Sequence, residues 1–156
     1  MAYKYSYEKF DKESMARSCG QNLSVSFKKS VEVARAIRGK KLSYAISYLE
    51  KVADQKAVVP YIRFKAEMGH KKGKGIDTGG YPVNVANAFL RLLKSAQKNA
   101  SEQEISGELY IKAVSARKGT KRYHAGRYSG RVMKSTNIEV IVAPKSKKKV
   151  EEVIKK

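Results

Sequence analysis

Apolar residues recur at helical spacing in three stretches of the chain, and each stretch predicts a helix. The first stretch begins at Phe27, after Ser26 as a candidate N-cap, and ends near Arg38, with Gly39 as its C-cap. The second covers residues 42–53, and the third begins near Pro82 and fades near residue 100. Their predicted apolar faces are Phe27, Val31, Ala34 and Ile37; Leu42, Ala45, Ile46, Leu49 and Val52; and Val85, Ala86, Phe89, Leu90, Leu92, Leu93 and Ala96.

Three other apolar stretches are short and predict strands, at residues 16–25, 109–114 and 138–142. We therefore expect an α+β fold, in which a small three-stranded antiparallel sheet packs against three helices on one face. The predicted core consists of Phe27, Val31, Ile37, Leu42, Ile46, Leu49, Phe89, Leu93, Ile111, Val140 and Val142.

The residues between the last two strands, 115–137, are almost all polar, basic, small or Tyr. A long structureless loop is uncommon in a compact domain, so we expect both strands to continue outward as a long protruding β-hairpin. With its tip near Gly126, the hairpin would reach on the order of 55 Å if fully extended. An isolated two-stranded ribbon is marginal in water, so an outside partner would have to hold it. The alternative is a disordered basic loop.

A second basic segment, at residues 55–81, interrupts the helical part of the chain. We call this segment the insertion. It contains Pro60, five glycines and interleaved cations, and few groups that could pack. We expect its residues 61–81 to become ordered only on RNA. The chain is predicted to be one domain with a 1–15 N-terminal arm, a 16–108 body, strands and hairpin at 109–143, and a basic 144–156 tail. Both termini are expected to be basic and extended, with a possible short amphipathic helix around Val150–Ile154.

The charge of the chain indicates a polyanionic partner. Lys and Arg total 34 against 14 Asp and Glu, which gives a formal net charge of +20. Nucleic acid is the first candidate, because phosphate contacts release counterions; an anionic membrane surface is the second. There is no apolar run long enough for a transmembrane helix and no secretory signal at Met1–Tyr7. Cys19 cannot form an internal disulfide, which agrees with a reducing cytoplasm.

Cations and aromatic residues supply the candidate site, because Lys and Arg bind phosphates while Tyr and His stack on unpaired bases. The candidates for RNA contact are Lys28 and Lys29; Arg38, Lys40 and Lys41; Arg63, Lys65, Lys71, Lys72 and Lys74 in the insertion; and Arg117, Lys118, Lys121, Arg122, Arg127, Tyr128, Arg131 and Lys134 in the hairpin. Tyr44 and Tyr48, at helical i, i+4 spacing, are either a packing pair or a platform for bases.

Catalytic chemistry is not indicated. The glycine-rich residues 73–80 lack the spacing of a nucleotide-binding loop, and His70 and His124 have no partner at metal-ligand spacing. Cys19 reads as a buried structural thiol, and Glu67 and Asp77 as solvated or locally paired charges. We expect no catalytic residue, metal or cofactor. A chromatin protein would need a groove-reading helix, and an RNA-modifying enzyme a pocket of convergent acids; neither pattern is found.

Several separated motifs resemble one ribosomal protein family. They are Leu23–Lys29, Ala36–Leu42, Leu109–Ala113 and Thr136–Val140, in the same order as in the universal large-subunit protein numbered twenty-two in the bacterial series and seventeen in the eukaryotic one. The resemblance covers about residues 15–145, and the insertion is similar to the archaeal and eukaryotic form.

This resemblance implies a structural, non-enzymatic protein of the large ribosomal subunit in the cytoplasm, which binds ribosomal RNA and supports assembly. It implies that the hairpin tip, formed by Arg122, Tyr123, His124, Ala125, Gly126 and Arg127, lines the peptide exit tunnel. The implied partners are large-subunit RNA, neighbouring ribosomal proteins and the nascent polypeptide. No membrane and no homo-oligomer are expected.

Overall fold

A computed structural model of the chain describes residues 5–73 and 75–145. The candidate Lys74, the first four residues and the possible helix around residues 150–154 lie outside the described residues, as does the basic tail beyond Lys145.

The main sheet has three antiparallel strands, β1 (Ala16–Leu23), β4 (Leu109–Lys118) and β5 (Thr136–Pro144), in the order β1-β5-β4. The last strand in the chain is therefore the central one, and Val142 lies opposite both Ala16 and Ile111. Because successive side chains of a strand point to opposite faces, Ile138, Val140 and Val142 share one face of β5.

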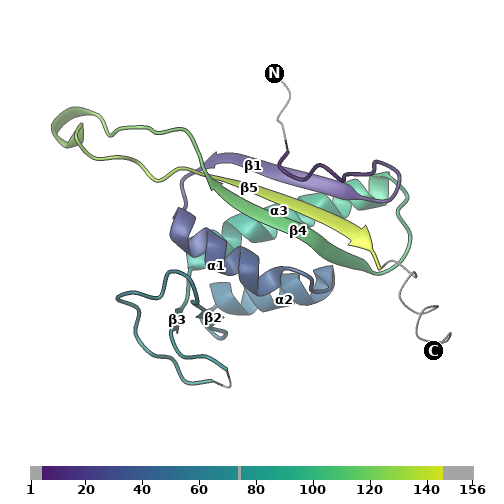
Figure 1. The fold of residues 1–156 in the computed structure, drawn as a ribbon, viewed down its shortest axis with the longest axis horizontal. Helices are drawn as coiled ribbons and strands as arrows, with labels where there is room; N and C mark the ends of the chain where they lie inside the picture. Colours follow the sequence, from purple (N-terminus) through teal and green to yellow (C-terminus); the bar gives the residue numbers. More distant parts are fainter. Residues whose placement is uncertain (1–4, 74, 146–156) are drawn as a thin grey trace.

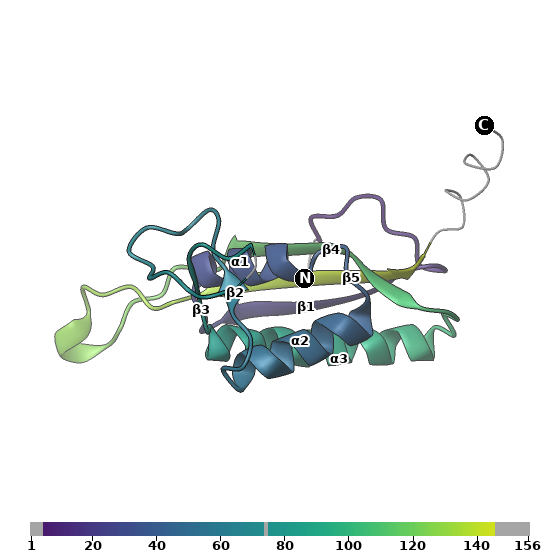
Figure 2. The same cartoon turned by 90° about the horizontal axis from the view of Figure 1, so that it is seen from below.

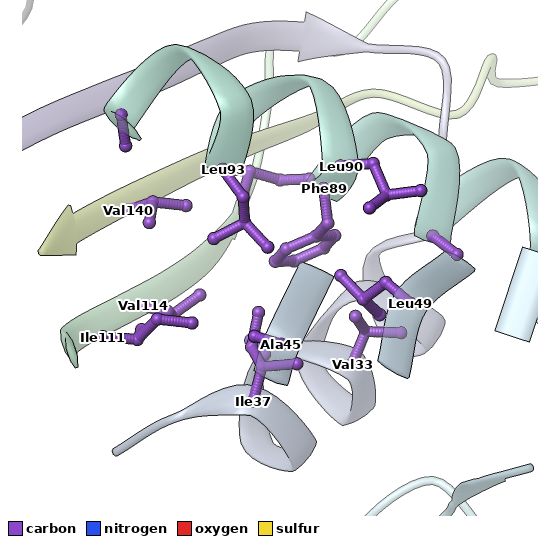
Figure 3. Packing of buried hydrophobic residues seen from close by; sticks show 14 of the residues in the cluster. Val33, Ile37, Ala45, Leu49, Phe89, Leu90, Leu93, Ile111, Val114 and Val140 are labelled. Atoms are coloured by element: carbon purple, nitrogen blue, oxygen red, sulfur yellow. The ribbon is translucent and has the colours of Figure 1, made fainter. Parts of the chain in front are cut away.

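Three helices pack against that face: α1 (Phe27–Ile37), α2 (Leu42–Ala53) and α3 (Val83–Glu102). Helix α3 runs along β1 and β5, α1 packs chiefly against β4, and α2 packs against α3 (Figures 1 and 2). Phe89 of α3 lies among Val33, Leu49 and Leu93, and all four are fully buried (Figure 3). The predicted α+β class, with three helices on a three-stranded sheet, is confirmed.

The core prediction needs one correction, on the first helix. Phe27 and Val31, like Ile46 of α2, are only partly buried. The buried face of α1 contains Val33, Ala34 and Ile37, together with Ser30 and Glu32. Apolar residues at both positions 31 and 33 make two helix faces possible from spacing alone, and packing against the sheet selects the face of Val33. Phe27 instead contacts Phe64 edge to face, with ring centroids 6.1 Å apart.

The insertion is packed at its base, which contradicts the expectation that it has few groups to pack. Short strands β2 (Val59–Pro60) and β3 (Gly79–Gly80) pair antiparallel, and the side chains of Val59 and Tyr61 are buried in the core. A side chain at Gly79 would collide with the Val59 carbonyl oxygen, so the two strands approach closely only because this residue is glycine.

Glu32 of α1 holds the next residues of the insertion. Only 1% of this residue is exposed, and its carboxylate accepts hydrogen bonds from the backbone N–H groups of Ile62, Arg63 and Phe64 at 2.7–3.1 Å. Buried carboxylates are stable when such donors replace water. The base of the insertion is therefore ordered by the body itself, and the expectation of ordering only on RNA is wrong there.

The N-terminal segment, residues 5–15, covers the other face of the sheet and is not a free extended arm. Tyr7 and Phe10 pack on Ile141 and its neighbours Met15 and Ala143, and the amide and hydroxyl of Ser6 donate to the buried Glu139 carboxylate. Nor is the segment basic, because Glu8, Asp11 and Glu13 outnumber its two lysines. Aromatic and polar residues alternate in this segment, and the aromatic ones cover the sheet face that the helices leave open.

Candidate nucleic-acid interface

Residues 119–135 form a loop that we call the basic arm, and it projects from one end of the sheet (Figure 1). The expected long β-hairpin is not confirmed, because β4 ends at Lys118 and β5 begins at Thr136. Beyond them an isolated bridge joins Tyr123 and Val132, and the two sides share single hydrogen bonds such as His124 N–H to the Arg131 carbonyl at 3.0 Å. Without an alternating apolar face the arm has no surface on which a regular ribbon could pack.

The tip of the arm exposes rings and cations together. A short 3-10 turn, Gly126–Tyr128, reverses the chain, and Gly126 has a φ of +62°, which suits glycine. The guanidinium carbons of Arg127 and Arg131 lie 5.5 and 4.9 Å from the Tyr128 ring centroid. Nearly half of Tyr128 and more than half of Tyr123 are exposed. The tip can therefore offer stacking faces and phosphate ligands to the same partner.

The base of the arm is held by Asn22, a residue that the sequence analysis did not single out. Its side-chain oxygen accepts from the Thr120 N–H at 2.8 Å and the Ser135 hydroxyl at 3.1 Å, and its own N–H donates to the Asn137 side chain at 2.7 Å. Asn22 has a φ of +49°, a conformation that asparagine tolerates better than most residues. We call this arrangement the asparagine clamp; it bonds both sides of the arm to the end of β1.

The predicted cations of the insertion, of the end of β4 and of the arm are exposed wherever the structure describes them. They are Arg63, Lys65, Lys71, Lys72, Arg117, Lys118, Lys121, Arg122, Arg127, Arg131 and Lys134, and Lys28 and Lys29 at the start of α1 are exposed as well. In the insertion, Asp77 is paired locally, since His70 Nδ1 lies 2.9 Å from its carboxylate. Of the two helical tyrosines, Tyr48 is half-buried, and its hydroxyl donates a hydrogen bond to the Val58 carbonyl. Tyr44 is exposed, and its ring stacks on the Tyr48 ring. Burial raises the pKa of Tyr48 to about 12.

The cations between α1 and α2 are less available than expected. Arg38 donates to the Val114 carbonyl at 2.9 Å, and Lys41 pairs with Glu108 at 2.8 Å. The hydrogen bond to Glu108 raises the pKa of Lys41, and the same bond lowers the pKa of Glu108. An acidic residue that is distant in the sequence therefore lies beside this cluster. Lys40 has no such partner within the described residues and lies 4.8 Å from the exposed Tyr44 ring.

We predict that Lys40→Gln flattens the salt dependence of RNA binding by roughly one unit of log–log slope, the effect of one lost phosphate contact. Lys41→Gln should flatten it less, because Glu108 already neutralises that charge. The measurement is binding affinity over a salt series. A variant with Gln in place of Arg38, Lys40 and Lys41 tests all three cations together. If its salt-dependence slope were unchanged, these cations would only stabilise the helix end.

Two features are absent from the described residues, a metal-binding cluster and a helix that could span a membrane. Within 5–73 and 75–145, no group of three or more His, Cys, Asp and Glu side chains could hold a metal ion. In the same part of the chain, no helix has the length and apolarity to cross a bilayer. Cys19 is only partly buried in β1, so its predicted burial is incomplete.

A small α+β body that carries basic, solvent-exposed loops is typical of a structural ribosomal protein.

Comparison with known proteins identifies the family. Residues 18–143 match the family model described as ribosomal protein L22p/L17e. Among similar proteins is the "Large ribosomal subunit protein uL22" of Methanococcus aeolicus, 37% identical over 139 residues, or 85% of this chain and 91% of the relative. The uL22 proteins of Methanococcoides burtonii and Methanocaldococcus jannaschii are 36% and 37% identical, covering 90% and 83% of this chain and 95% and 88% of the relatives.

The chain belongs to the ribosomal protein L22p/L17e family. It is accordingly a structural protein of the large ribosomal subunit and not an enzyme, and the cytoplasmic location expected from the sequence agrees with this membership. The family suspected from the sequence motifs is thereby confirmed, and the archaeal relatives agree with the archaeal and eukaryotic form inferred from the insertion.

Proposed function

We propose that this protein binds large-subunit ribosomal RNA through its basic arm and insertion, supports assembly of the subunit, and lines part of the peptide exit tunnel with the tip of the arm. The observation that carries the proposal is the arm itself: residues 121–134 are all exposed and contain Lys121, Arg122, Arg127, Arg131 and Lys134 with no carboxylate among them. Within the described residues the cations of this segment form no ion pair, and folded RNA supplies both phosphates and unstacked bases.

The partners follow from the same arrangement. Arm and insertion extend from the same end of the body (Figure 1), so one continuous RNA surface could contact both. Neighbouring large-subunit proteins would meet the faces of the body that RNA leaves free. The nascent polypeptide would meet the tip, where Tyr123 and His124 offer exposed ring side chains.

Sedimentation tests the main proposal. The protein should travel with the large subunit through a sucrose gradient and should be released by high salt, because phosphate contacts weaken as salt rises. A protein that sediments with chromatin instead, or that stays free of both, would contradict the proposal.

The tip should show two separable effects. Arg122→Ala combined with Arg127→Ala should slow subunit assembly, because two guanidinium groups that can bind phosphates in a fork are lost. Tyr123→Ala or His124→Ala should leave assembly nearly normal but change crosslinking between the tip and the nascent peptide. The measurement is site-specific crosslinking from position 123 or 124 in stalled ribosomes. If probes there capture only RNA while probes in the body capture the peptide, the arm does not line the tunnel.

A further inference from the structure

Two hollows meet where the basic arm leaves the body. The larger, of about 460 Å³, lies between the start of α1 and both sides of the arm. Its lining consists of Val25, Ser26, Phe27, Lys28, Lys118, Gly119, Thr120, Lys121, Val132, Met133, Lys134 and Ser135. The smaller, of about 230 Å³, lies between the starts of α1 and α3 and shares Val25, Ser26 and Lys134 with the first. The two hollows are therefore neighbours on one surface.

The larger hollow combines cations with apolar surface. Lys28, Lys118, Lys121 and Lys134 contribute to its wall, and no acidic residue does. Within the described residues, none of these lysines has a carboxylate within ion-pair distance. Other hollows on the protein differ in this respect, because the one beside Lys41 contains Glu108 and the one beneath the insertion contains Asp77. The electrostatics of the larger hollow thus favour an anion.

Apolar side chains in the same hollow favour a ligand that also has a flat hydrophobic part. Val132 and Met133 are neighbours on the arm and are 50% and 42% exposed, so they present apolar surface to a ligand. The half-buried Phe27 faces them from α1, and Lys118 Nζ lies 5.9 Å from the centre of its ring. A nucleobase fits a wall of this composition, since it can stack on a ring while its phosphates meet the lysines.

The smaller hollow carries positive charge that would attract a phosphate. The first residues of α3, Val83 and Asn84, line it together with Ser26 and Lys29 of the α1 start. Neither helix has a side-chain cap or an acidic residue in its first turn, so both positive helix ends face this hollow uncompensated. Lys29 and Lys134 add two full charges at the same place.

We propose that the two hollows together hold one unstacked nucleotide of a single-stranded RNA segment. The base lies in the larger hollow against Phe27 and Met133, and an adjoining phosphate lies in the smaller one beside Lys29 and the helix starts. This site rests on the proposed RNA-binding function and gives it a chemical preference, for single-stranded over duplex RNA. Duplex RNA keeps its bases stacked inside the helix and can offer these hollows only phosphates.

The experiment uses the full chain, isotopically labelled, and two probes: hexa-adenylate and a stable RNA duplex, compared at equal phosphate concentration. Hexa-adenylate should shift the NMR signals of the Phe27, Asn84 and Met133 amides, and the duplex should shift them far less. Phe27→Leu keeps an apolar side chain but removes the ring, and it should weaken hexa-adenylate binding at least about fivefold, the lower limit for loss of one base–aromatic stack.

A charge variant guards against a folding defect. Lys28→Gln with Lys134→Gln changes two exposed side chains and should also weaken hexa-adenylate binding, while Lys51→Gln with Lys98→Gln removes the same charge from outside both hollows and should weaken it less. Equal effects of the two double variants, or shifts confined to the tip of the arm, would overturn the site while leaving RNA binding intact. Binding of an acidic peptide at the hollows in preference to hexa-adenylate would overturn it too. Failure to bind ribosomal RNA at all would refute the proposed function itself.

Discussion

Phe89→Ala should destabilise the isolated protein by about 3–5 kcal/mol, the usual cost of removing a fully buried aromatic side chain. Phe89 lies at the centre of the core, where α3 meets α2 and the sheet (Figure 3), and none of its surface is exposed. Truncation leaves a cavity surrounded by Val33, Leu49 and Leu93, which belong to different elements and cannot all move inward. The measurement is the free energy of unfolding in denaturant.

Tyr123→Ala is a suitable control for this variant, because it truncates an aromatic side chain that is 54% exposed on the arm. Its effect on stability should stay within about 0.5 kcal/mol, as for most surface substitutions. If the two variants lost similar stability, Phe89 would not be a core residue.

The second large effect is expected from Glu32. Glu32→Ala removes the acceptor of three backbone hydrogen bonds and should cost on the order of 3 kcal/mol, about two charge-assisted bonds at the lower end of their range. The cost is less than the full sum, because Ile62 and Arg63 are exposed residues and water can replace part of the lost hydrogen bonding. The insertion should also become more mobile, which faster hydrogen exchange of the Arg63 and Phe64 amides would reveal.

Glu32→Gln makes this test more specific. The Oε1 atom that accepts from Arg63 and Phe64 can be kept, but the amide NH2 group would then face the Ile62 N–H, donor against donor. We expect Glu32→Gln to lower the free energy of unfolding by less than Glu32→Ala does. Glu50→Gln makes the same chemical change at an exposed position of α2 and serves as the control. Stability equal to wild type in both Glu32 variants would mean that the carboxylate does not hold the insertion.

The sequence predicted the secondary structure well because its signals there are local. Helical spacing placed α2 and α3 nearly at their observed ends, and the alternation of Ile138, Val140 and Val142 identified the face of β5 that meets the helices. The cations of the arm are exposed, as expected for a basic segment with few apolar residues. Whether they contact RNA stays a prediction.

What the sequence missed depends on contacts between distant residues. Glu32 looks like an ordinary surface acid in a helix, and only the return of residues 62–64 to α1 makes it a buried acceptor. The pairing of Lys41 with Glu108 joins residues far apart in the chain. Asn22 and Gly119 gave little indication of their role, because an asparagine near the end of a strand and a glycine just after a strand are both common in turns. Their meeting at the base of the arm could not be read from spacing.

The asparagine clamp has a consequence for how the protein can be altered. Asn22 bonds to Thr120 on one side of the arm and Ser135 on the other, and both neighbouring strands are already paired in the sheet. The body therefore holds the two ends of the arm together, whatever sequence lies between them. Lengthening or shortening the segment between these two residues should cost the fold little, since loop-closure entropy changes slowly with length. Evolution, or a protein engineer, can thus remodel residues 121–134 as a replaceable module, and limits on its length would come from whatever the arm contacts outside the body.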